Sequence, residues 1–302
     1  MEEFRYRLEE NLFALETELT QGTYRHGPYK VFTVSDAKKR SIAVASIKDR
    51  LVHRLLYDHL EEIYDPVFLF DAWSCRKEKG LHKAIERAQH FLHRFRDGWF
   101  WRGDVRKFFD NVDQSVLLSL LKRRVSDQRT LSLLSEVIGS YGSGIVTKVP
   151  IGARRGIPIG NVTSQIFANI YLHEFDRFVK HTLKVRGYLR YGDDFVFFAH
   201  SRVDLETASK TATAFLLNNL SLPLHPRNNV LLPCKRGLHF LGYQIFPNGR
   251  RLPRRTWNKL LRRLGLKNVA SYAGLVRSEG NEKHVRRFEW ETLALLDTEI
   301  VH

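Results

Sequence analysis

Two adjacent aspartates, Asp193 and Asp194, lie between short apolar segments in residues 189–199, which read LRYGDDFVFFA. Glycine and aspartate tolerate the backbone angles of a tight turn, so residues 192–194 are expected to join two strands as a hairpin. Two like charges at such a turn repel each other and lose hydration. A divalent cation removes this cost, because Mg²⁺ prefers carboxylate oxygens and often brings substrate phosphates with it. The alternative is an ordinary solvent-facing turn.

A third carboxylate, Asp104, ends an expected strand in residues 99–109, which read WFWRGDVRKFF. Trp99, Trp101 and Gly103 share one face of this strand by the two-residue period, so Asp104 projects from the other face. A single aspartate at a strand end is most often a cap or a turn residue. A chemical role for Asp104 therefore depends on the elements around it.

The apolar spacing predicts a mixture of helices and strands around these carboxylates. The expected elements, in order, are a helix within 1–30, a hairpin at 29–45, helices at 47–64 and 81–95, the strand with Asp104, a helix to about 137, a long helix over 167–183, the aspartate hairpin, a helix at 203–219, a second hairpin at 230–246 and a basic helix at 250–263. The loop at 154–165 (RRGIPIGNVTSQ) fits a phosphate-facing segment at least as well as a simple helix entry. The segment at 70–79 (FDAWSCRKEK) suits either nucleotide contacts or core packing.

The chain has 302 residues and a net charge of +16, from 49 Lys and Arg against 33 Asp and Glu. This excess predicts a polyanionic partner, either nucleic acid or an acidic membrane. Eleven basic residues and no acidic ones lie in 227–267, which favours contact with a nucleic-acid backbone. No run approaches twenty apolar residues, so a membrane partner is not expected. Two distant cysteines, Cys75 and Cys234, argue against a disulfide scaffold or zinc cluster and indicate a reduced, cytoplasmic setting.

The order of elements resembles the palm of a template-dependent polymerase, and residues 191–194 (YGDD) are similar to the YxDD motif of reverse transcriptases. Residues 104–109 (DVRKFF) resemble the family's first palm motif, and FLGY at 240–243 is similar to its primer-grip hairpin. Residues 48–53 (KDRLVH) and 74–82 (SCRKEKGLH) resemble fingers motifs of bacterial, intron-type enzymes. The resemblance covers almost the whole chain. It implies an α+β right-hand polymerase with fingers at 1–98 (141–165 also contributing), a ferredoxin-like palm at 99–246 and a short helical basic thumb at 247–302.

This resemblance assigns the catalytic role to Asp104, Asp193 and Asp194. They would hold two Mg²⁺ ions, for which Mn²⁺ can substitute, with the Val105 backbone carbonyl as a further ligand. Phe109 would be the bulky gate that excludes a ribose 2′-OH. The other expected nucleotide-binding residues are Lys39, Arg40, Arg76, Ile159, Gly160 and Gln165. The expected primer–template contacts are Phe240, Leu241, Gly242, Tyr243, Arg250, Arg251, Arg254, Arg255 and Lys259.

The chain departs from the family pattern at the position linked to the leaving group. Relatives often place a lysine there that could protonate pyrophosphate, whereas this chain has Asn228. His225 or Arg227 could substitute, or the step needs no side-chain acid.

Residues 156–172 resemble the second palm motif and indicate a subfamily. Intron and retroviral enzymes usually read QGxxxSP there, whereas residues 159–165 (IGNVTSQ) have the form IGxxxSQ. That form resembles reverse transcriptases of diversity-generating retroelements, which copy a template RNA with errors at adenines. Ile159 removes a hydrogen-bonding amide beside the nascent base pair, so looser base discrimination is physically reasonable. Antiviral defence reverse transcriptases, which use an associated non-coding RNA, are the alternative.

The expected partners are an RNA template, its cDNA and dNTPs, and an accessory protein subunit or a dedicated non-coding RNA stays open. Two other functions compete with reverse transcription. An RNA-dependent RNA polymerase also fits residues 192–194 (GDD), but Phe109 argues against it because RNA synthesis needs room for the 2′-OH. A non-catalytic nucleic-acid-binding protein could share the fold, but all three aspartates are present.

Overall fold

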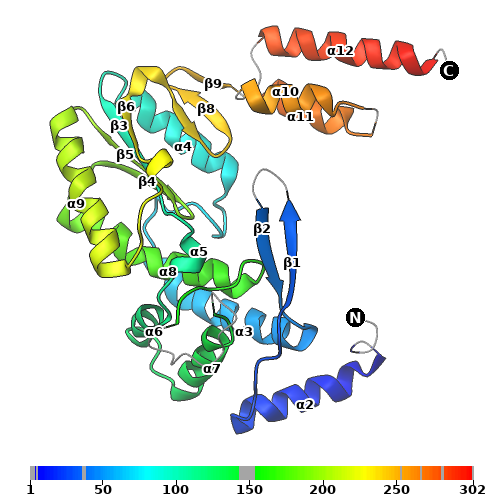
Figure 1. The fold of residues 1–302 in the computed structure, drawn as a ribbon, viewed down its shortest axis with the longest axis vertical. Coiled ribbons are helices and arrows are strands. Elements are labelled where there is room, and N and C mark those ends of the chain that lie inside the picture. The colour runs from blue at the N-terminus through cyan, green and yellow to red at the C-terminus, as the bar shows by residue number, and fades with distance from the viewer. Residues whose placement is uncertain are drawn as a thin grey trace.

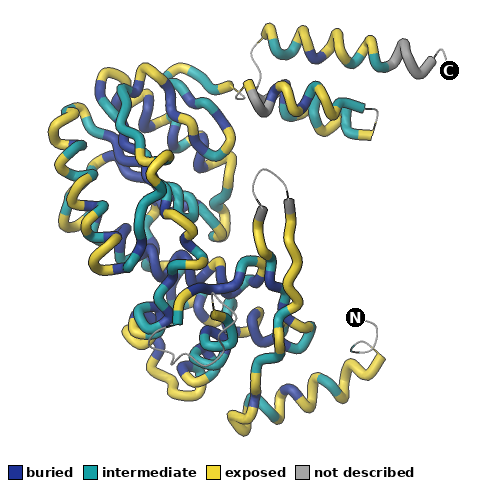
Figure 2. Tube along the Cα trace, in the orientation of Figure 1, coloured by how far each residue is buried: buried dark blue, intermediate teal, exposed yellow. Residues whose placement is uncertain are grey.

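The computed structural model describes residues 4, 6–35, 39–142, 154–251, 254–265, 267–279 and 282–300. The elements form a sheet with helices on both faces, a second helical group with a projecting hairpin, and three C-terminal helices (Figure 1). Figure 2 shows that buried residues gather in the sheet and its covering helices, whereas the hairpin and the N-terminal helix are largely exposed.

Helix α2 (Leu8–Gln21) is shorter than the helix expected within residues 1–30. It ends because Gly22 adopts a left-handed conformation, with φ at 69°, and its N–H bonds back to the last turn. The chain then runs to strand β1 (Lys30–Ser35), which pairs antiparallel with β2 (Lys39–Val44). This hairpin is a two-stranded sheet of its own.

The central sheet is antiparallel and has the strand order β4–β5–β3–β6. Its strands are β3 (Trp99–Asp104), β4 (Gly187–Tyr191), β5 (Asp194–Ala199) and β6 (Val230–Pro233). Helices separate β3 from β4 and β5 from β6, which is the β–α–β–β–α–β order of a ferredoxin-like unit. The α+β architecture expected from the sequence is therefore present.

Alternation along the strands sends side chains into two apolar layers. Trp101 and Phe197 face a core with α8 (Val162–Arg177) and α9 (Arg202–Leu220). Phe198 faces a second core with α4 (Leu81–Arg94). Helix α8 continues as a π-helical turn over Phe178–Thr182. Because both faces are buried, the strand register is strongly specified, and the register fixes where the strand-end aspartates lie.

The helical group below the sheet contains α3 (Ile47–Tyr64), α5 (Phe108–Asn111), α6 (Gln114–Lys122) and α7 (Gln128–Gly139). Helix α3 has the predicted bounds, but the single helix expected up to residue 137 is three helices. The breaks occur at Asp113 and Asp127, whose side chains accept hydrogen bonds from amides of the following turn and so start new helices.

The prediction of a single hairpin at 230–246 is wrong, because the two halves of this segment belong to different sheets. Strand β6 pairs with β3 at the edge of the central sheet, and Gly237 then turns the chain at a positive φ of 78°. Strands β7 (Leu238–Phe240), β8 (Tyr243–Phe246) and β9 (Gly249–Arg251) form a separate sheet. This sheet crosses the domain boundary expected after residue 246.

The C-terminal helices are α10 (Arg254–Arg262), α11 (Val269–Glu279) and α12 (Glu282–Ile300). Their buried residues Trp257, Leu260, Val276 and Phe288 belong to the same apolar cluster as residues of α4, β7 and β8. Within the described ranges, no helix is long and apolar enough to cross a membrane.

Candidate active site

The strand register brings the three aspartates together from distant parts of the chain. Asp104 at the end of β3 pairs with Asp194 at the start of β5, so both side chains leave the same face of the sheet. Asp193 lies in the β4–β5 turn beside Gly192, whose φ is 62°. The Asp193 carbonyl accepts a hydrogen bond of 3.3 Å from the Val105 amide. The turn is thus tied to the strand that carries Asp104.

Glycine at position 103 leaves room for the Phe195 ring of β5. It shares the Trp101 face of β3, as the two-residue period predicted, and pairs with Phe195 across the sheet. A Cβ at this position would lie 2.5 Å from the Phe195 ring, so any other residue would have to displace this buried side chain. Since Asp104 follows directly, Gly103 helps to set its position relative to the turn.

Burial and mutual repulsion disfavour ionisation of the paired aspartates. Burial, together with the charges of Asp104 and Asp194, raises the pKa of Asp193 to about 6. The pKa of Asp194 also rises to about 6, because burial outweighs the opposing effect of Arg102. The positive charge of Arg40 in the β1–β2 hairpin acts in the other direction and lowers the pKa of Asp193. A divalent cation would favour the carboxylate forms in the same way.

Arg102 occupies the carboxylate of Asp194. Its Nε lies 2.9 Å from one carboxylate oxygen and its Nη2 lies 2.5 Å from the other. Its Nη1 donates to the His239 carbonyl of β7 at 2.6 Å. Both oxygens of Asp194 therefore accept hydrogen bonds from a guanidinium in this conformation.

The donor set favours a hard cation but is not a preformed metal cage. In the described part of the chain, no group of three or more His, Cys, Asp or Glu side chains is arranged to hold a metal ion. Asp104 and Asp193 nevertheless offer hard oxygen donors, and the raised pKa of Asp193 indicates negative charge that lacks compensation. The hydrogen bonds that flank Val105 use the Asp104 carbonyl and the Arg106 amide, so they do not occupy the Val105 carbonyl. These donors fit Mg²⁺ or Mn²⁺.

Asn228, at the position where the family pattern led us to expect a lysine, contacts the Asp104 carboxylate directly. Its Nδ2 donates to Oδ2 of Asp104 at 2.6 Å. The short 3₁₀ turn Pro226–Asn228 presents it, and the His225 amide bonds the Asp104 carbonyl at 2.7 Å. An amide cannot act as a general acid, so Asn228 orients Asp104 and does not replace the lysine. The Arg227 side chain is exposed, and the His225 ring accepts a hydrogen bond from the Arg227 amide.

The glycine-rich loop before α8 is fastened to strand β2. The Ile159 carbonyl accepts a 2.9 Å hydrogen bond from the Ala43 amide, and Asn161 bonds the Ala43 carbonyl at 2.9 Å. At Gly160, where φ is 117°, a Cβ would lie 2.8 Å from Ile42, so this contact also requires glycine. Ile159 is half-buried and Gln165 is exposed. The loop and the hairpin therefore form one surface.

The remaining nucleotide-binding expectations have different outcomes. Arg40 is exposed on β2 and acts electrostatically on Asp193, whereas the Lys39 side chain lies outside the described part of the structure. Phe109 is half-buried and packs edge-on against Phe108, with ring centroids 5.3 Å apart. Arg76 is not available for a nucleotide. Its side chain is only 9% exposed and bonds Oδ1 of Asp65 at 2.6 Å and three backbone carbonyls.

The primer-grip residues also divide into two kinds. Phe240 and Tyr243 are buried in the apolar core, so their side chains do not reach a primer. Leu241 and Gly242 form the tight turn between β7 and β8, with φ values of 50° and 85°. Within residues 240–243, this turn is the part that can contact a nucleic acid. Two of the expected basic contacts, Arg250 and Arg251, lie on β9. The other three, Arg254, Arg255 and Lys259, lie on α10, and the Arg255 side chain is outside the described part.

The comparison with protein families identifies the chain. Residues 33–245 match the family described as reverse transcriptase (RNA-dependent DNA polymerase). The chain belongs to this family. Among relatives of this reverse transcriptase, protein YkfC of Escherichia coli is 26% identical over 279 residues, covering 79% of this chain and 72% of the relative. The group II intron-encoded protein LtrA of Lactococcus lactis is 23% identical over 304 residues, covering 78% of this chain and 50% of LtrA.

Solved structures show the same fold. Telomerase from Candida albicans, in complex with a fragment of telomeric RNA, matches with a TM-score of 0.57 at 12% identity, over 91% of this chain and 55% of the telomerase. Apo telomerase from Candida tropicalis matches with a TM-score of 0.56 over 90% of this chain and 57% of the telomerase. This reverse transcriptase thus spans only about half the length of LtrA and of the telomerases.

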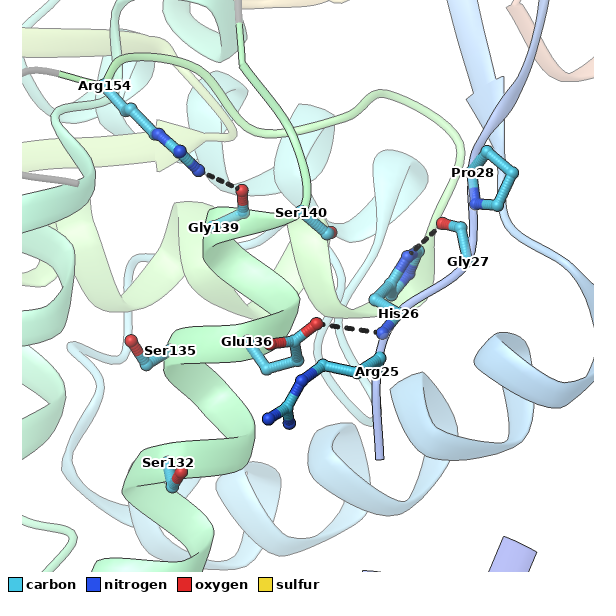
Figure 3. A pocket seen from close by; sticks show the side chains of 10 residues that line it. All are labelled: Arg25, His26, Gly27, Pro28, Ser132, Ser135, Glu136, Gly139, Ser140 and Arg154. Carbon is cyan, nitrogen blue, oxygen red and sulfur yellow. Dashed lines mark hydrogen bonds between the residues drawn. The ribbon is translucent and has the colours of Figure 1, made fainter. Parts of the chain in front are cut away.

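A cavity of about 570 Å³ lies apart from the three aspartates (Figure 3). Its lining comes from the segment at 25–28, helix α7 and Arg154, and contains none of the predicted site residues. Glu136 accepts a 3.0 Å hydrogen bond from the His26 amide there, and Arg154 donates to the Gly139 carbonyl at 2.7 Å. The first bond joins the N-terminal segment to α7, and the second joins the loop before α8 to the same helix. We therefore interpret the cavity as part of the scaffold.

Sequence reasoning missed Arg102 and the contact of Asn228 with Asp104. The two-residue period places Arg102 on the Asp104 face of β3, so its presence beside the carboxylates could have been predicted. The contact of Asn228 with Asp104 could not, because it depends on how β6 returns to the edge of the sheet. Both residues act on the carboxylates without being acidic themselves.

Proposed function

We propose that this chain is an RNA-directed DNA polymerase that makes cDNA by nucleotidyl transfer at Asp104 and Asp193. The observation that carries the proposal is the register of β3 with β5, which sets Asp104 beside the Asp193–Asp194 turn on one face of the palm sheet. The site lies in a chain that matches the reverse transcriptase family over residues 33–245.

In this proposal the protein aligns the reacting groups and compensates their negative charge, because phosphoryl transfer needs little else from side chains. Two bound Mg²⁺ ions would activate the primer 3′-hydroxyl and neutralise the leaving pyrophosphate. Asp104 and Asp193 would hold these ions with help from Asp194, and Asn228 keeps the Asp104 carboxylate in place. Arg40, with Lys39 next to it, binds the triphosphate, and Phe109 excludes the 2′-OH.

The proposal also includes the division of the chain into polymerase domains. Residues 1–98, with 141–165, act as fingers, 99–246 as palm and 247–302 as a basic thumb. The hydrogen bonds between the loop at 159–161 and β2 support the assignment of that loop to the fingers. The exposed turn Leu241–Gly242 and the basic residues of β9 and α10 hold the primer–template backbone without reading its sequence.

Within the family, we infer a role in a diversity-generating retroelement. The IGxxxSQ form of residues 159–165 supports it, with Ile159 in place of a hydrogen-bonding side chain. An antiviral defence enzyme with its own non-coding RNA is the second candidate. The Candida albicans telomerase, which shares this fold, was solved with an RNA fragment, and this supports an RNA partner in either case.

A non-catalytic nucleic-acid-binding protein is favoured by one observation, the engagement of Asp194 by Arg102. Primer extension separates these functions. The full chain is incubated with a primed RNA template, Mg²⁺ and either dNTPs or rNTPs, and the products are sequenced. We expect DNA product from dNTPs, with errors at template adenines. Accurate or repetitive DNA would support the defence role, and no product from folded protein that binds the duplex would support a binding protein.

The matched variants are Asp193→Asn and Asp58→Asn. Asp58 lies on α3 in an exposed pair with Arg54, so its loss should leave synthesis unchanged. Asp193→Asn should abolish synthesis while circular dichroism and duplex binding stay at the level of the unaltered protein. Full activity of folded Asp193→Asn would disprove the assignment.

A further inference from the structure

Phe70 is an exposed aromatic residue directly before three buried residues of the same loop. Its side chain is 63% exposed, whereas Asp71, Ala72 and Trp73 that follow it are buried. Burying a phenylalanine typically gains about 1.5–3 kcal/mol, so its exposure on a rigid segment is a cost that a ligand could recover. The segment at 70–79 is the one whose mixture of aromatic and basic residues suited either nucleotide contacts or core packing.

The loop that carries Phe70 is held rigidly. Arg76 ties it to Asp65 and to the Leu69 carbonyl at 2.6 and 2.7 Å. Arg87 of α4 forms a bidentate pair with Asp71 at 2.7 and 3.0 Å. Phe70 is therefore presented from a fixed backbone, so little conformational entropy would be lost when a ligand binds.

A cation lies against the Phe70 ring. The Lys79 amine is 3.5 Å from the ring centroid and donates a 3.0 Å hydrogen bond to the Phe70 carbonyl. The same amine lies 4.3 Å from the Trp73 ring centroid. An aromatic surface next to a fixed positive charge matches a nucleobase attached to a phosphate, because the base stacks and the phosphate pairs with the cation.

The loop lies directly beside the catalytic turn. The Trp73 amide donates a 2.9 Å hydrogen bond to the Arg190 carbonyl of β4. A Cβ at Gly192 would lie 3.9 Å from the Ser74 hydroxyl oxygen. Gly192 directly precedes Asp193, so a strand that leaves or enters the active site passes close to this loop.

We propose that Phe70 and Lys79 form a stacking site for an unpaired base of a single-stranded nucleic acid next to the active site. This inference rests on the proposed polymerase function. An unpaired base is required because the bases inside a duplex already stack on their neighbours. RNA and DNA share this chemistry, and separate measurements distinguish them.

The test measures binding of the full chain to labelled oligonucleotides by fluorescence anisotropy. The ligands are a primed RNA with a single-stranded template overhang, single-stranded RNA, single-stranded DNA and a blunt duplex. Phe70→Ala should weaken binding to the ligands with unpaired bases by about tenfold, since stacking on one aromatic residue contributes about that factor. Phe70→Trp should restore the affinity, and binding to the blunt duplex should not change.

Phe13→Ala is the matched control, because Phe13 is 66% exposed on the N-terminal helix α2. It should bind as the unaltered protein does. Lys79→Met should reduce the slope of log affinity against log salt concentration by about one, as expected for the loss of one phosphate contact. Circular dichroism and thermal unfolding check that each variant is folded.

The possible outcomes separate this inference from the polymerase assignment. Equal binding of Phe70→Ala and the unaltered protein, in a protein that extends primers, would overturn the stacking site alone. Equal losses on the blunt duplex would also overturn it, since a general backbone contact would then be the cause. Failure of the unaltered protein to bind any of the four ligands would overturn both. A loss confined to RNA would identify the template as the stacked strand.

Discussion

Arg102 and Asp194 form a bidentate ion pair on the face of the sheet that carries Asp104, with N–O distances of 2.9 and 2.5 Å. Because Arg102 also bonds the His239 carbonyl, it joins the aspartate hairpin to the β7–β8 hairpin. The pair is largely buried, at 23% and 14% side-chain exposure. Arg102 is thus a positioning residue for both parts of the site.

We expect Arg102→Met to lower the free energy of unfolding by about 3–5 kcal/mol, because it leaves Asp194 buried and unpaired. Primer affinity should fall as well, since the β7–β8 hairpin loses its tie to β5. Arg102→Met/Asp194→Asn should recover most of the stability, which a double-mutant cycle would measure. Arg54→Met, at an exposed pair, is the control. An additive cycle would show that the two side chains do not interact.

Asn228 gives a second prediction, through its 2.6 Å hydrogen bond to Asp104. Asn228→Asp should nearly abolish nucleotide addition, because a new carboxylate would repel Asp104. Asn228→Lys should remain active, since an ammonium can donate to the same oxygen and restores the residue type that relatives often carry there. Single-turnover rates at saturating dNTP test both. Comparable loss in the two variants would mean that the shape of Asn228, and not its charge, is what matters.

The fold was predictable where one segment determines its own structure. Helix α3 has the predicted bounds because its apolar period is regular and Ser46 caps it. The paired aspartates were predictable for the same reason, since glycine and aspartate at 192–194 specify a turn. The partner of a strand is different. Alternation shows that residues 230–233 form a strand, but not that they pair with β3 instead of β8.

The same distinction applies to the residues of the candidate site. Asp104, Asp193 and Asp194 could be named from residue type and spacing. Arg76 was misassigned, because its sequence neighbours do not reveal Asp65, which binds it across the loop. Phe240 and Tyr243 were misassigned because the motif locates a hairpin but not which of its side chains face the core.

A third prediction concerns the buried pair Arg190–Asp176, whose side chains are both fully buried and 2.7 Å apart. Arg190 also bonds the Gly192 carbonyl at 3.0 Å and so holds the turn between β4 and β5. Asp176→Asn should destabilise the protein by about 3–5 kcal/mol, because it leaves a buried guanidinium without its counter-charge. Urea unfolding measures this. Glu206→Gln, which removes one partner of an exposed pair with Arg202, should cost less than about 1 kcal/mol.

Phe109 provides a fourth prediction. If its ring blocks the 2′-OH, then Phe109→Val should admit ribonucleotides and raise the rNTP-to-dNTP ratio of kcat/KM by at least about tenfold. The ring packs on Phe108, so Phe109→Val should also lose a little stability. Phe108→Leu, in the neighbouring buried position, controls for repacking. Unchanged selectivity in active Phe109→Val would place the gate on another residue.

The last prediction concerns pH. The pKa of Asp193 in the folded, metal-free protein is about 6, whereas an aspartate in an unfolded chain titrates near 4. Between these values the folded state binds more protons than the unfolded state, so the free energy of unfolding decreases as the pH rises. In EDTA, we expect the unaltered protein to lose about 1–3 kcal/mol between roughly pH 4 and pH 6.5 through this group. Asp193→Asn should remove that part of the decrease. Asp97→Asn is the control, because Lys235 lowers the pKa of Asp97 and any effect of that aspartate falls at lower pH.

Adding Mg²⁺ at neutral pH should raise the thermal midpoint of the unaltered protein but not that of Asp193→Asn. Equal shifts in both would show that Asp193 does not bind the cation.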